Sequence, residues 1–233
     1  MRYRGSKIII ENIHRIYNLI RQAESASHRA EGSVQLLAVS KGHTYSQIEE
    51  AYTAGLRDFG ENYLQEALPK IQALHTLSLN WHFIGPIQSN KTQGIAKHFS
   101  WVHSVSSQKI AQRLSDARPS SMPSLNICLQ VNLDDESSKS GLEPNEIAPL
   151  AAFIQTLPGL HLRGLMLIPR PQVDEEAQYN SFLRLTALRD DLNQQLNLSL
   201  DTLSMGMSND MEAAIRAGST IVRIGTAIFG KRM

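Results

Sequence analysis

One lysine in this sequence follows directly after a short apolar segment, a setting in which a reactive amine can form. Residues 34–40 read VQLLAVS, a run typical of a strand buried on both faces, and Lys41 comes next. A cationic lysine is costly to hold at such a position, which favours the neutral amine. A neutral lysine amine attacks an aldehyde to form a Schiff base. A solvated surface lysine is the alternative, and position alone leaves both open.

Two segments near the C-terminus have residue types suited to an anion. Ser208 precedes a predicted helix, and Gly225 and Thr226 follow a predicted strand. Backbone N–H groups at a helix start bind phosphate oxygens, and glycine lets the backbone approach them closely. Ser208 is at least as typical of a plain helix N-cap, and Gly225 of a turn.

Arg223 and Asn62 are polar residues at other predicted strand ends. Arg223 lies within the last predicted strand, where a buried arginine needs an acceptor. That acceptor is a carboxylate, a phosphate, or a ring nitrogen that the cation keeps unprotonated. Asn62 follows the second predicted strand and either holds a polar group of a ligand or caps the next helix. His82 and His103 are expected to be core or loop residues, and no histidine spacing typical of a metal site occurs.

Strand-like and helix-like segments alternate along the chain. Ile9, Ile13, Ile16 and Ile20 recur every three or four residues, which predicts a leading amphipathic helix. Strands are expected at residues 34–40, 58–61, 81–85, 101–105, 125–133, 162–168, 202–206 and 220–225.

Two of the intervening helices have recognisable end signals. A capping box of Ser46 and Glu49, with Gly55 as the stop signal, predicts a helix after the first strand. Asp174 is expected to cap a helix that reaches about residue 196. The remaining helices are expected at residues 63–77, 91–98, 107–117, 143–156 and 209–217.

Eight strands, each followed by a helix or a final turn, predict a parallel sheet, and eight is the number that closes a barrel. An open doubly wound sheet is the alternative, but no G-x-G-x-x-G follows the first strand. We therefore expect one domain over residues 1–233, a (β/α)₈ TIM barrel with an additional N-terminal helix. The active face of such barrels is the C-terminal end of the strands, where Lys41, Arg223 and the anion-binding residues would meet.

Composition limits the partners and the location. The formal net charge of +1 gives no global field that would attract nucleic acid or an acidic membrane. The single cysteine, Cys128, cannot form an internal disulfide, which fits a reducing compartment. The apolar run of residues 8–10 is too short for a secretion signal or a membrane span. A cytoplasmic protein with no nucleic-acid or membrane partner is expected.

Five segments in the same order resemble the YggS/PROSC family of pyridoxal phosphate homeostasis proteins. The resemblance covers nearly the whole chain and implies a barrel like the N-terminal domain of alanine racemase. The segments are AVSK (38–41), FGENYLQEA (59–67), HFIGPIQSNK (82–91), SMGMSND (204–210) and RIGTAIFG (223–230).

The resemblance also implies roles for individual residues. Lys41 would hold pyridoxal 5′-phosphate as a Schiff base, and Arg223 would lie near the pyridine ring. An arginine there keeps the ring neutral and weakens its capacity to store electrons, which suits a carrier better than a catalyst. Asn62 and Met166 would lie beside the cofactor. The phosphate group would be held by Ser208, Gly225 and Thr226.

The sequence departs from the family directly after the lysine, where Gly42, His43 and Thr44 stand in place of residues such as Thr-Lys-Pro. This departure leaves the rim contacts around Lys41 open.

Three functions remain in competition. A carrier would buffer the cofactor, pass it to pyridoxal-phosphate-dependent apo-enzymes and influence vitamin B6 and amino-acid balance. An amino-acid racemase needs an acid/base group on each face of the bound substrate, and the domain that supplies the second one in alanine racemase is not expected here. A cofactor-free aldolase or isomerase using Lys41 is the third. We expect the carrier, without enzymatic activity and most simply as a monomer.

Overall fold

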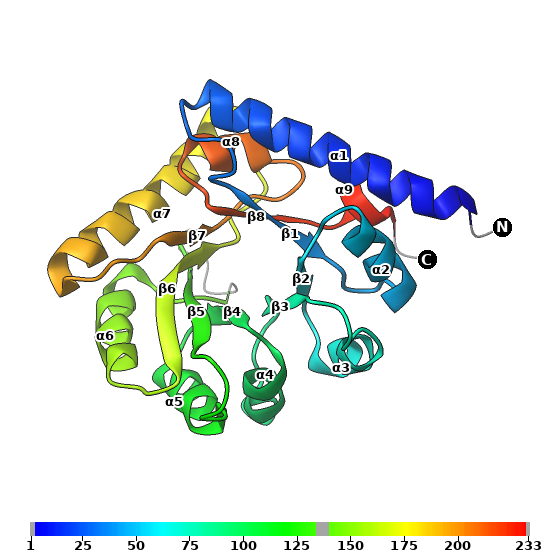
Figure 1. The fold of residues 1–233 in the computed structure, drawn as a ribbon. Helices are drawn as coiled ribbons and strands as arrows, with labels where there is room; N and C mark the ends of the chain where they lie inside the picture. The colour runs from blue at the N-terminus through cyan, green and yellow to red at the C-terminus, as the bar shows by residue number, and fades with distance from the viewer. Residues whose placement is uncertain (1–2, 134–139, 232–233) are drawn as a thin grey trace.

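The computed structural model describes residues 3–133 and 140–231, and within them eight parallel strands close into a barrel (Figure 1). Neighbouring strands pair in chain order, and the last strand returns to pair with the first. The predicted barrel is therefore confirmed. The strands are Gln35–Val39 (β1), Asp58–Glu61 (β2), Asn80–Phe83 (β3), Trp101–Val105 (β4), Leu125–Val131 (β5), Leu160–Leu167 (β6), Thr202–Ser204 (β7) and Ile221–Ile224 (β8).

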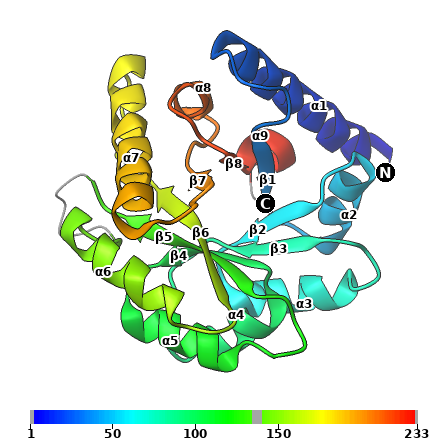
Figure 2. The same cartoon turned by 60° about the vertical axis from the view of Figure 1, so that its left-hand side comes forward.

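Helices surround the barrel, as the two ribbon views show (Figures 1 and 2). Their apolar faces pack on the outward-facing residues of the strands and form a continuous core. The helices of the described residues are Tyr3–Ala26 (α1), Tyr45–Thr53 (α2), Leu64–Ala73 (α3), Thr92–His98 (α4), Gln108–Ala117 (α5), Pro144–Gln155 (α6), Glu175–Leu196 (α7), Met211–Arg216 (α8) and Thr226–Phe229 (α9).

The leading helix α1 covers the side of the barrel on which β8 meets β1. It packs against α2, α8 and α9, and Figure 1 shows it in blue across that side. The four isoleucines predicted to form its apolar face are all buried. Glu24, near its end, is 1% exposed and accepts hydrogen bonds from the N–H groups of Gly32 (3.1 Å) and Val34 (2.8 Å). These bonds fix the path by which the chain enters β1.

Several predicted boundaries differ from the observed ones. The capping box of α2 is formed by Thr44 and Gln47, not by Ser46 and Glu49, because the chain has already turned at residues 40–43 and the helix begins one position before Ser46. The helix expected at residues 63–77 ends at Ala73, and the helix expected from residue 209 begins at Met211. The ranges predicted for β2 and β4 agree with the structure, and Asp174 caps α7 as expected.

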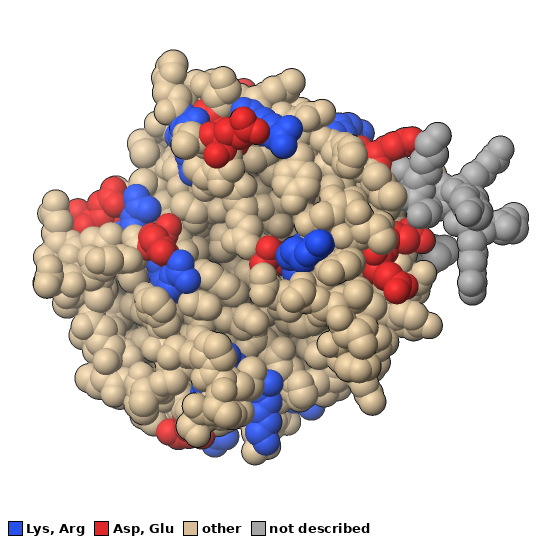
Figure 3. All heavy atoms as spheres, in the orientation of Figure 1, with Lys and Arg blue, Asp and Glu red and all other residues tan. Residues whose placement is uncertain are grey.

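Charged side chains are interspersed on the face of the molecule drawn in Figure 3. Basic and acidic groups lie next to one another there and do not gather into a patch of one sign. This distribution agrees with the formal net charge of +1. No helix of the described residues is long and apolar enough to cross a membrane.

Candidate ligand-binding site

The seven residues proposed from the sequence all belong to the C-terminal ends of strands or to the loops that follow them. Lys41 and Asn62 come after β1 and β2, and Met166 and Arg223 are the second-last residues of β6 and β8. Ser208 follows β7, Gly225 caps α9, and Thr226 is the first residue of α9. The strand ends of a parallel barrel share one rim, so the fold directs these segments to the same end.

Lys41 lies at the corner of a tight turn and not on the strand itself. The N–H of His43 donates to the carbonyl oxygen of Ser40 (3.1 Å), and Gly42 has a φ of +75°. A positive φ at the third position is the signature of a type II turn, where glycine is favoured. Lys41 is half-buried. The direction of its side chain is therefore set by the turn, because β1 ends at Val39.

The loops after β1 and β8 lie against each other. Ala38 pairs with Ile224, and a Cβ atom placed on Gly225 would come within 3.2 Å of the carbonyl oxygen of Val39. Beyond this contact the His43 ring stacks on Phe229 of α9 with 4.8 Å between ring centroids. Residues almost 190 positions apart in sequence are thereby brought together next to Lys41.

The three residues that depart from the family pattern each have a structural role. Gly42 adopts the positive φ of the turn, and His43 stacks on Phe229. The hydroxyl of Thr44 accepts a hydrogen bond from the N–H of Gln47, which caps α2. The Gly-His-Thr sequence is thus compatible with an ordered rim around Lys41.

Arg223 is buried inside the barrel and bonds to uncharged oxygen atoms. One terminal nitrogen donates to the carbonyl oxygen (2.5 Å) and the hydroxyl (2.8 Å) of Ser204, and the other donates to the carbonyl oxygen of Leu167 (2.9 Å). No carboxylate of the described residues forms an ion pair with it, so the structural ion pair considered from the sequence is not found in that part of the chain. Burial lowers the pKa of Arg223 to about 10, and the guanidinium remains a cation at neutral pH.

A chain of hydrogen bonds crosses the barrel interior from Asp58 to Arg223. Asp58 contacts His82 (3.1 Å), and His82 contacts His103 (3.0 Å). His103 contacts the hydroxyl of Ser204 (2.7 Å), the group that accepts from Arg223. One arrangement of protons satisfies every bond: each neutral imidazole donates through Nε2 toward Asp58 and accepts at Nδ1. All the hydrogen bonds of this series therefore point the same way, from the cationic Arg223 toward the anionic Asp58.

Burial keeps the two histidines of this chain neutral. Burial lowers the pKa of His82 against the opposing influence of Asp58, and it holds the pKa of His103 well below its usual value, with His82 and Arg223 adding to the effect. Burial alone would raise the pKa of Asp58, but the hydrogen bond from His82 keeps it below the ordinary value. The sequence-based interpretation of His82 and His103 as core residues agrees with their full burial.

Asn62 presents an unused acceptor near the turn that carries Lys41. Its Oδ1 atom is buried and has no hydrogen-bond partner among the described residues. The N-cap of α3 is Tyr63, so Asn62 is not the cap that the sequence also allowed. A Cβ atom on Gly85 would fall 2.1 Å from the backbone oxygen of Asn62, so the segment after β3 requires glycine there to approach it. An orphaned acceptor in such a place fits a ligand donor group.

Ser208 and Met166 are placed differently from one another. Ser208 is exposed in a turn before α8, whose N-cap is Asp210, so the N-cap role considered for Ser208 is wrong. It lines a hollow of about 350 Å³ together with Leu19 and residues of α7 and α8. Met166 is buried in β6, where it pairs with Ser204.

Sequence reasoning missed the buried charged residues behind Lys41. Lys70 of α3 is 6% exposed and contacts both Glu61 and Glu66. The spacing of Glu66 and Lys70 was a visible signal, but four-residue acid–base pairs are common on exposed helix faces. It therefore did not indicate burial. Among the described residues no three His, Cys, Asp or Glu side chains are arranged to hold a metal ion.

Comparison with known proteins identifies the family. Residues 15–233 match the model of the alanine racemase N-terminal domain. The pyridoxal phosphate homeostasis protein of Pseudomonas aeruginosa is 58% identical over 224 residues, which covers 96% of each chain. This chain belongs to the pyridoxal phosphate homeostasis protein family.

Solved structures of similar chains have the same fold. PipY of Synechococcus elongatus with PLP bound has a TM-score of 0.81 and 38% identity, covering 91% of this chain and 100% of PipY. A protein of unknown function from Bifidobacterium adolescentis has a TM-score of 0.91 and 34% identity, covering 98% and 97% of the two chains. The Pseudomonas aeruginosa relative is named for homeostasis of a cofactor and not for a reaction.

The buried histidines predict a loss of stability on acidification. As the pH falls below about 6.5, the unfolded chain takes up protons at His82 and His103 while the folded chain does not. The free energy of unfolding should fall by up to about 1.4 kcal/mol per pH unit for each histidine until its folded-state pKa is reached. Urea unfolding at pH 7.5 and pH 5.5 measures this.

A matched pair of variants assigns the effect to the interior chain. His103→Gln should start less stable than the wild type but lose less stability between the two pH values, whereas the exposed His98→Gln should behave like the wild type. An identical pH dependence in wild type and His103→Gln would contradict the assignment.

Proposed function

We propose that this protein binds pyridoxal 5′-phosphate at the mouth of its barrel, holds it as a Schiff base on Lys41, and acts as a carrier of the cofactor. The observation that carries the proposal is the contact between the loops after β1 and β8. The turn that bears Lys41 lies next to the segment that bears Gly225. A Cβ atom on Gly225 would have the carbonyl oxygen of Val39, two residues before Lys41, as its nearest neighbour. The bound PLP in PipY, a relative of 38% identity, supports the same conclusion.

The residues present fit the chemistry of the cofactor. The unsatisfied Oδ1 of Asn62 can accept from the ring hydroxyl, and the hydroxyls of Ser208 and Thr226 can donate to phosphate oxygens. The described hydrogen bonds of Arg223 use its terminal nitrogens and leave the Nε–H group for a ligand acceptor. When bound, pyridoxal phosphate would supply an aldehyde for covalent attachment and a ring that can store electrons.

The chemical work of the protein in this proposal is attachment and orientation. The amine of Lys41, in its neutral form, would attack the aldehyde carbon to form a C=N bond, and the carbonyl oxygen would leave as water. Ser208, Gly225 and Thr226 hold the anionic end, and Met166 supplies apolar contact in the barrel wall. Arg223, cationic and held by three hydrogen bonds, would keep a neighbouring ring nitrogen unprotonated.

A carrier is supported over an enzyme by the charge of Arg223. A ring that stays neutral stores electrons poorly, so it supports little carbanion chemistry, while its attachment to Lys41 is unaffected. The names of the curated relatives, which specify homeostasis, agree with this. Transfer to pyridoxal-phosphate-dependent apo-enzymes, a monomeric state, a single domain and a cytoplasmic location are further parts of the proposal.

Removal of the lysine amine tests the covalent attachment. Lys41→Ala should lack the absorbance band of the Schiff base, so borohydride should cause no change in its spectrum. The thermal midpoint of the variant should stay close to that of the wild type, because a half-buried turn residue contributes little to the core. Mass spectrometry of the reduced wild type should locate the modified residue at Lys41. A wild-type protein that stays colourless with pyridoxal phosphate would instead support a cofactor-free barrel enzyme.

Removal of two hydroxyls tests the phosphate site. The Ser208→Ala, Thr226→Ala double variant should weaken retention of pyridoxal 5′-phosphate by about 100-fold or more, since two hydrogen bonds to a charged group are lost and each is worth about 1.5–3 kcal/mol. Both residues are exposed, so the fold should be unaffected. Equilibrium dialysis measures retention, and unphosphorylated pyridoxal serves as the matched ligand, whose binding should not change. Wild-type retention by the double variant would show that the phosphate lies elsewhere.

The match to an alanine racemase domain keeps a racemase-like enzyme as the second candidate. A panel of L- and D-amino acids incubated with the purified protein should show turnover no greater than that of free pyridoxal phosphate, because a ring kept neutral by Arg223 stabilises the required carbanion poorly. Chiral chromatography measures it. Sustained conversion of one amino acid that is lost in Lys41→Ala would establish the enzyme and contradict the carrier.

A further inference from the structure

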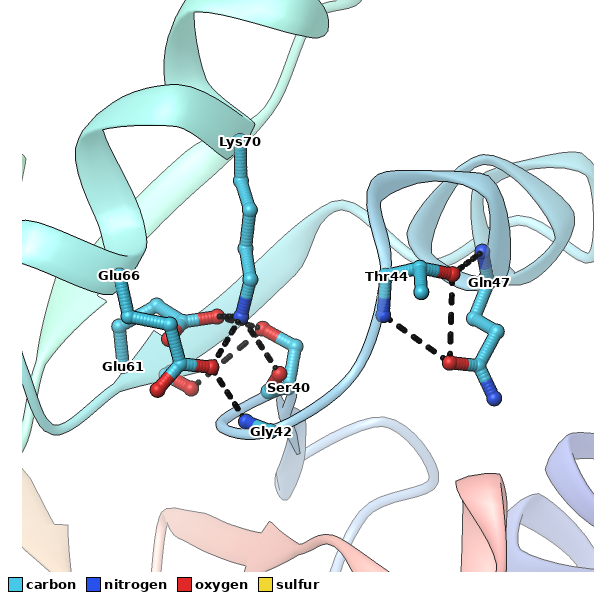
Figure 4. Close-up of polar contacts among 8 residues, drawn as sticks. Ser40, Gly42, Thr44, Gln47, Glu61, Glu66 and Lys70 are labelled. Carbon is cyan, nitrogen blue, oxygen red and sulfur yellow. Dashed lines mark hydrogen bonds and ion pairs between the residues drawn. The ribbon is translucent and has the colours of Figure 1, made fainter. Parts of the chain in front are cut away.

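A buried cluster of charged residues lies directly behind the turn that bears Lys41. Figure 4 shows the ammonium group of Lys70 between two carboxylates, at 2.8 Å from Glu61 Oε1 and 2.7 Å from Glu66 Oε1. The side chain of Lys70 is 8% exposed and that of Glu61 is fully buried, whereas that of Glu66 is 31% exposed. All three residues come from β2 and α3, the βα unit that follows the one carrying Lys41.

The cluster bonds to the backbone on both sides of Lys41. The Nζ atom of Lys70 donates to the carbonyl oxygen of Ser40 (2.9 Å), and the N–H of Gly42 donates to Glu66 Oε1. The hydroxyl of Ser40 donates to Glu61 Oε1 (2.6 Å). The residue before Lys41 and the residue after it are therefore held by the same group of charges, as Figure 4 shows.

Stability alone does not explain why the cluster is ionic. A buried ion pair loses hydration, and replacing it with apolar residues of similar volume is often neutral or stabilising. One carboxylate oxygen, Glu61 Oε2, is even buried without a hydrogen-bond partner among the described residues. The hydrogen bonds to Ser40 and Gly42, however, have a use that apolar residues could not supply, because only polar groups can hydrogen-bond to a peptide N–H or carbonyl oxygen.

We propose that Glu61, Lys70 and Glu66 are positioning residues for Lys41: they hold the turn so that the amine meets the aldehyde at bonding distance. The inference rests on the proposed function. By restraining the two neighbouring peptides before the cofactor arrives, the cluster reduces the conformational entropy that Lys41 must lose when the covalent link forms. The effect acts on covalent attachment and not on the noncovalent recognition of the ring and the phosphate.

Two ligands separate these contributions. Pyridoxal 5′-phosphate can attach to Lys41, whereas pyridoxine 5′-phosphate has the same ring and phosphate but an alcohol in place of the aldehyde. Glu66→Ala removes the acceptor of the Gly42 N–H at a partly exposed position. It should weaken pyridoxal 5′-phosphate binding by roughly 10- to 100-fold and change pyridoxine 5′-phosphate binding less than about 2-fold. Fluorescence titration of the purified full-length protein measures both.

Matched variants test the positioning role against a general structural one. Glu66→Gln keeps an oxygen for the Gly42 N–H and should recover most of the affinity. Glu49→Ala and Lys97→Met, both at exposed helix positions, should leave both ligands unaffected. Lys70→Met should follow Glu66→Ala if it folds. If Lys70→Met fails to fold because the buried Glu61 loses its partner, the comparison of Glu66→Ala with Glu66→Gln decides the question alone.

Hydrogen exchange of the cofactor-free protein gives an independent measurement. The Gly42 amide should exchange faster in Glu66→Ala than in the wild type, while the amides of β1 keep their protection.

The outcomes distinguish the inference from the proposed function. Equal weakening of both ligands by Glu66→Ala, or no change in either, would overturn the positioning role while Lys41→Ala still lost covalent attachment. If the wild type bound both ligands equally and Lys41→Ala changed neither, the covalent role of Lys41 would fail and the inference with it. Selective weakening with recovery in Glu66→Gln supports both.

Discussion

The pairing of β8 with β1 is the constraint on which the rest of the structure depends. It closes the sheet, and it sets Gly225 against Val39 so that the first and last strand ends share one rim. Glycine at position 225 permits this approach, because a larger residue would crowd the backbone of β1. The stacking of His43 on Phe229 continues the contact beyond the strands. Without this closure, Lys41 and Arg223 would belong to opposite edges of an open sheet.

Two polar systems lie on opposite sides of the barrel wall. Inside, the hydrogen-bonded chain from Asp58 through two neutral histidines ends at Arg223. Between β2 and α3, the charges around Lys70 end at the peptides beside Lys41. Buried polar groups are costly unless each is satisfied, and both systems satisfy most of their members through neighbours from other strands. Each one terminates at a residue of the proposed cofactor site.

The sequence predicted the elements well where the signal was local. The predicted ranges of β2 and β4 match the observed strands, and Asp174 identified the start of α7. Local signals gave a wrong prediction where two residues could each be the N-cap of the same helix. Ser46 and Thr44 both begin a plausible capping box for α2. The turn that decides between them is fixed by contacts with α3 and α9, which no pattern near residue 44 encodes.

The sequence located the proposed site but did not identify the residues that support it. Strand-end rules and the family resemblance named Lys41 and Arg223, because their places in the chain are enough to assign them to the rim. The role of Lys70 depends on which face of α3 packs against the barrel, and the same Glu-x-x-x-Lys spacing occurs on solvated helices. Ser208 shows the reverse error, in which a local signal predicted a role that the structure does not have. Serine is a common N-cap residue, but the N-cap of α8 is Asp210, two residues later.

The seam between the first and last strands also has a consequence for how the protein is made. During synthesis the Lys41 turn leaves the ribosome long before residues 223–226, and a growing chain that lacks β8 has no partner for the free edge of β1. The seven-stranded sheet can neither close nor complete the proposed cofactor site. Binding of a small molecule at the proposed site can therefore occur only after the barrel has closed. Such binding cannot help the nascent chain to fold.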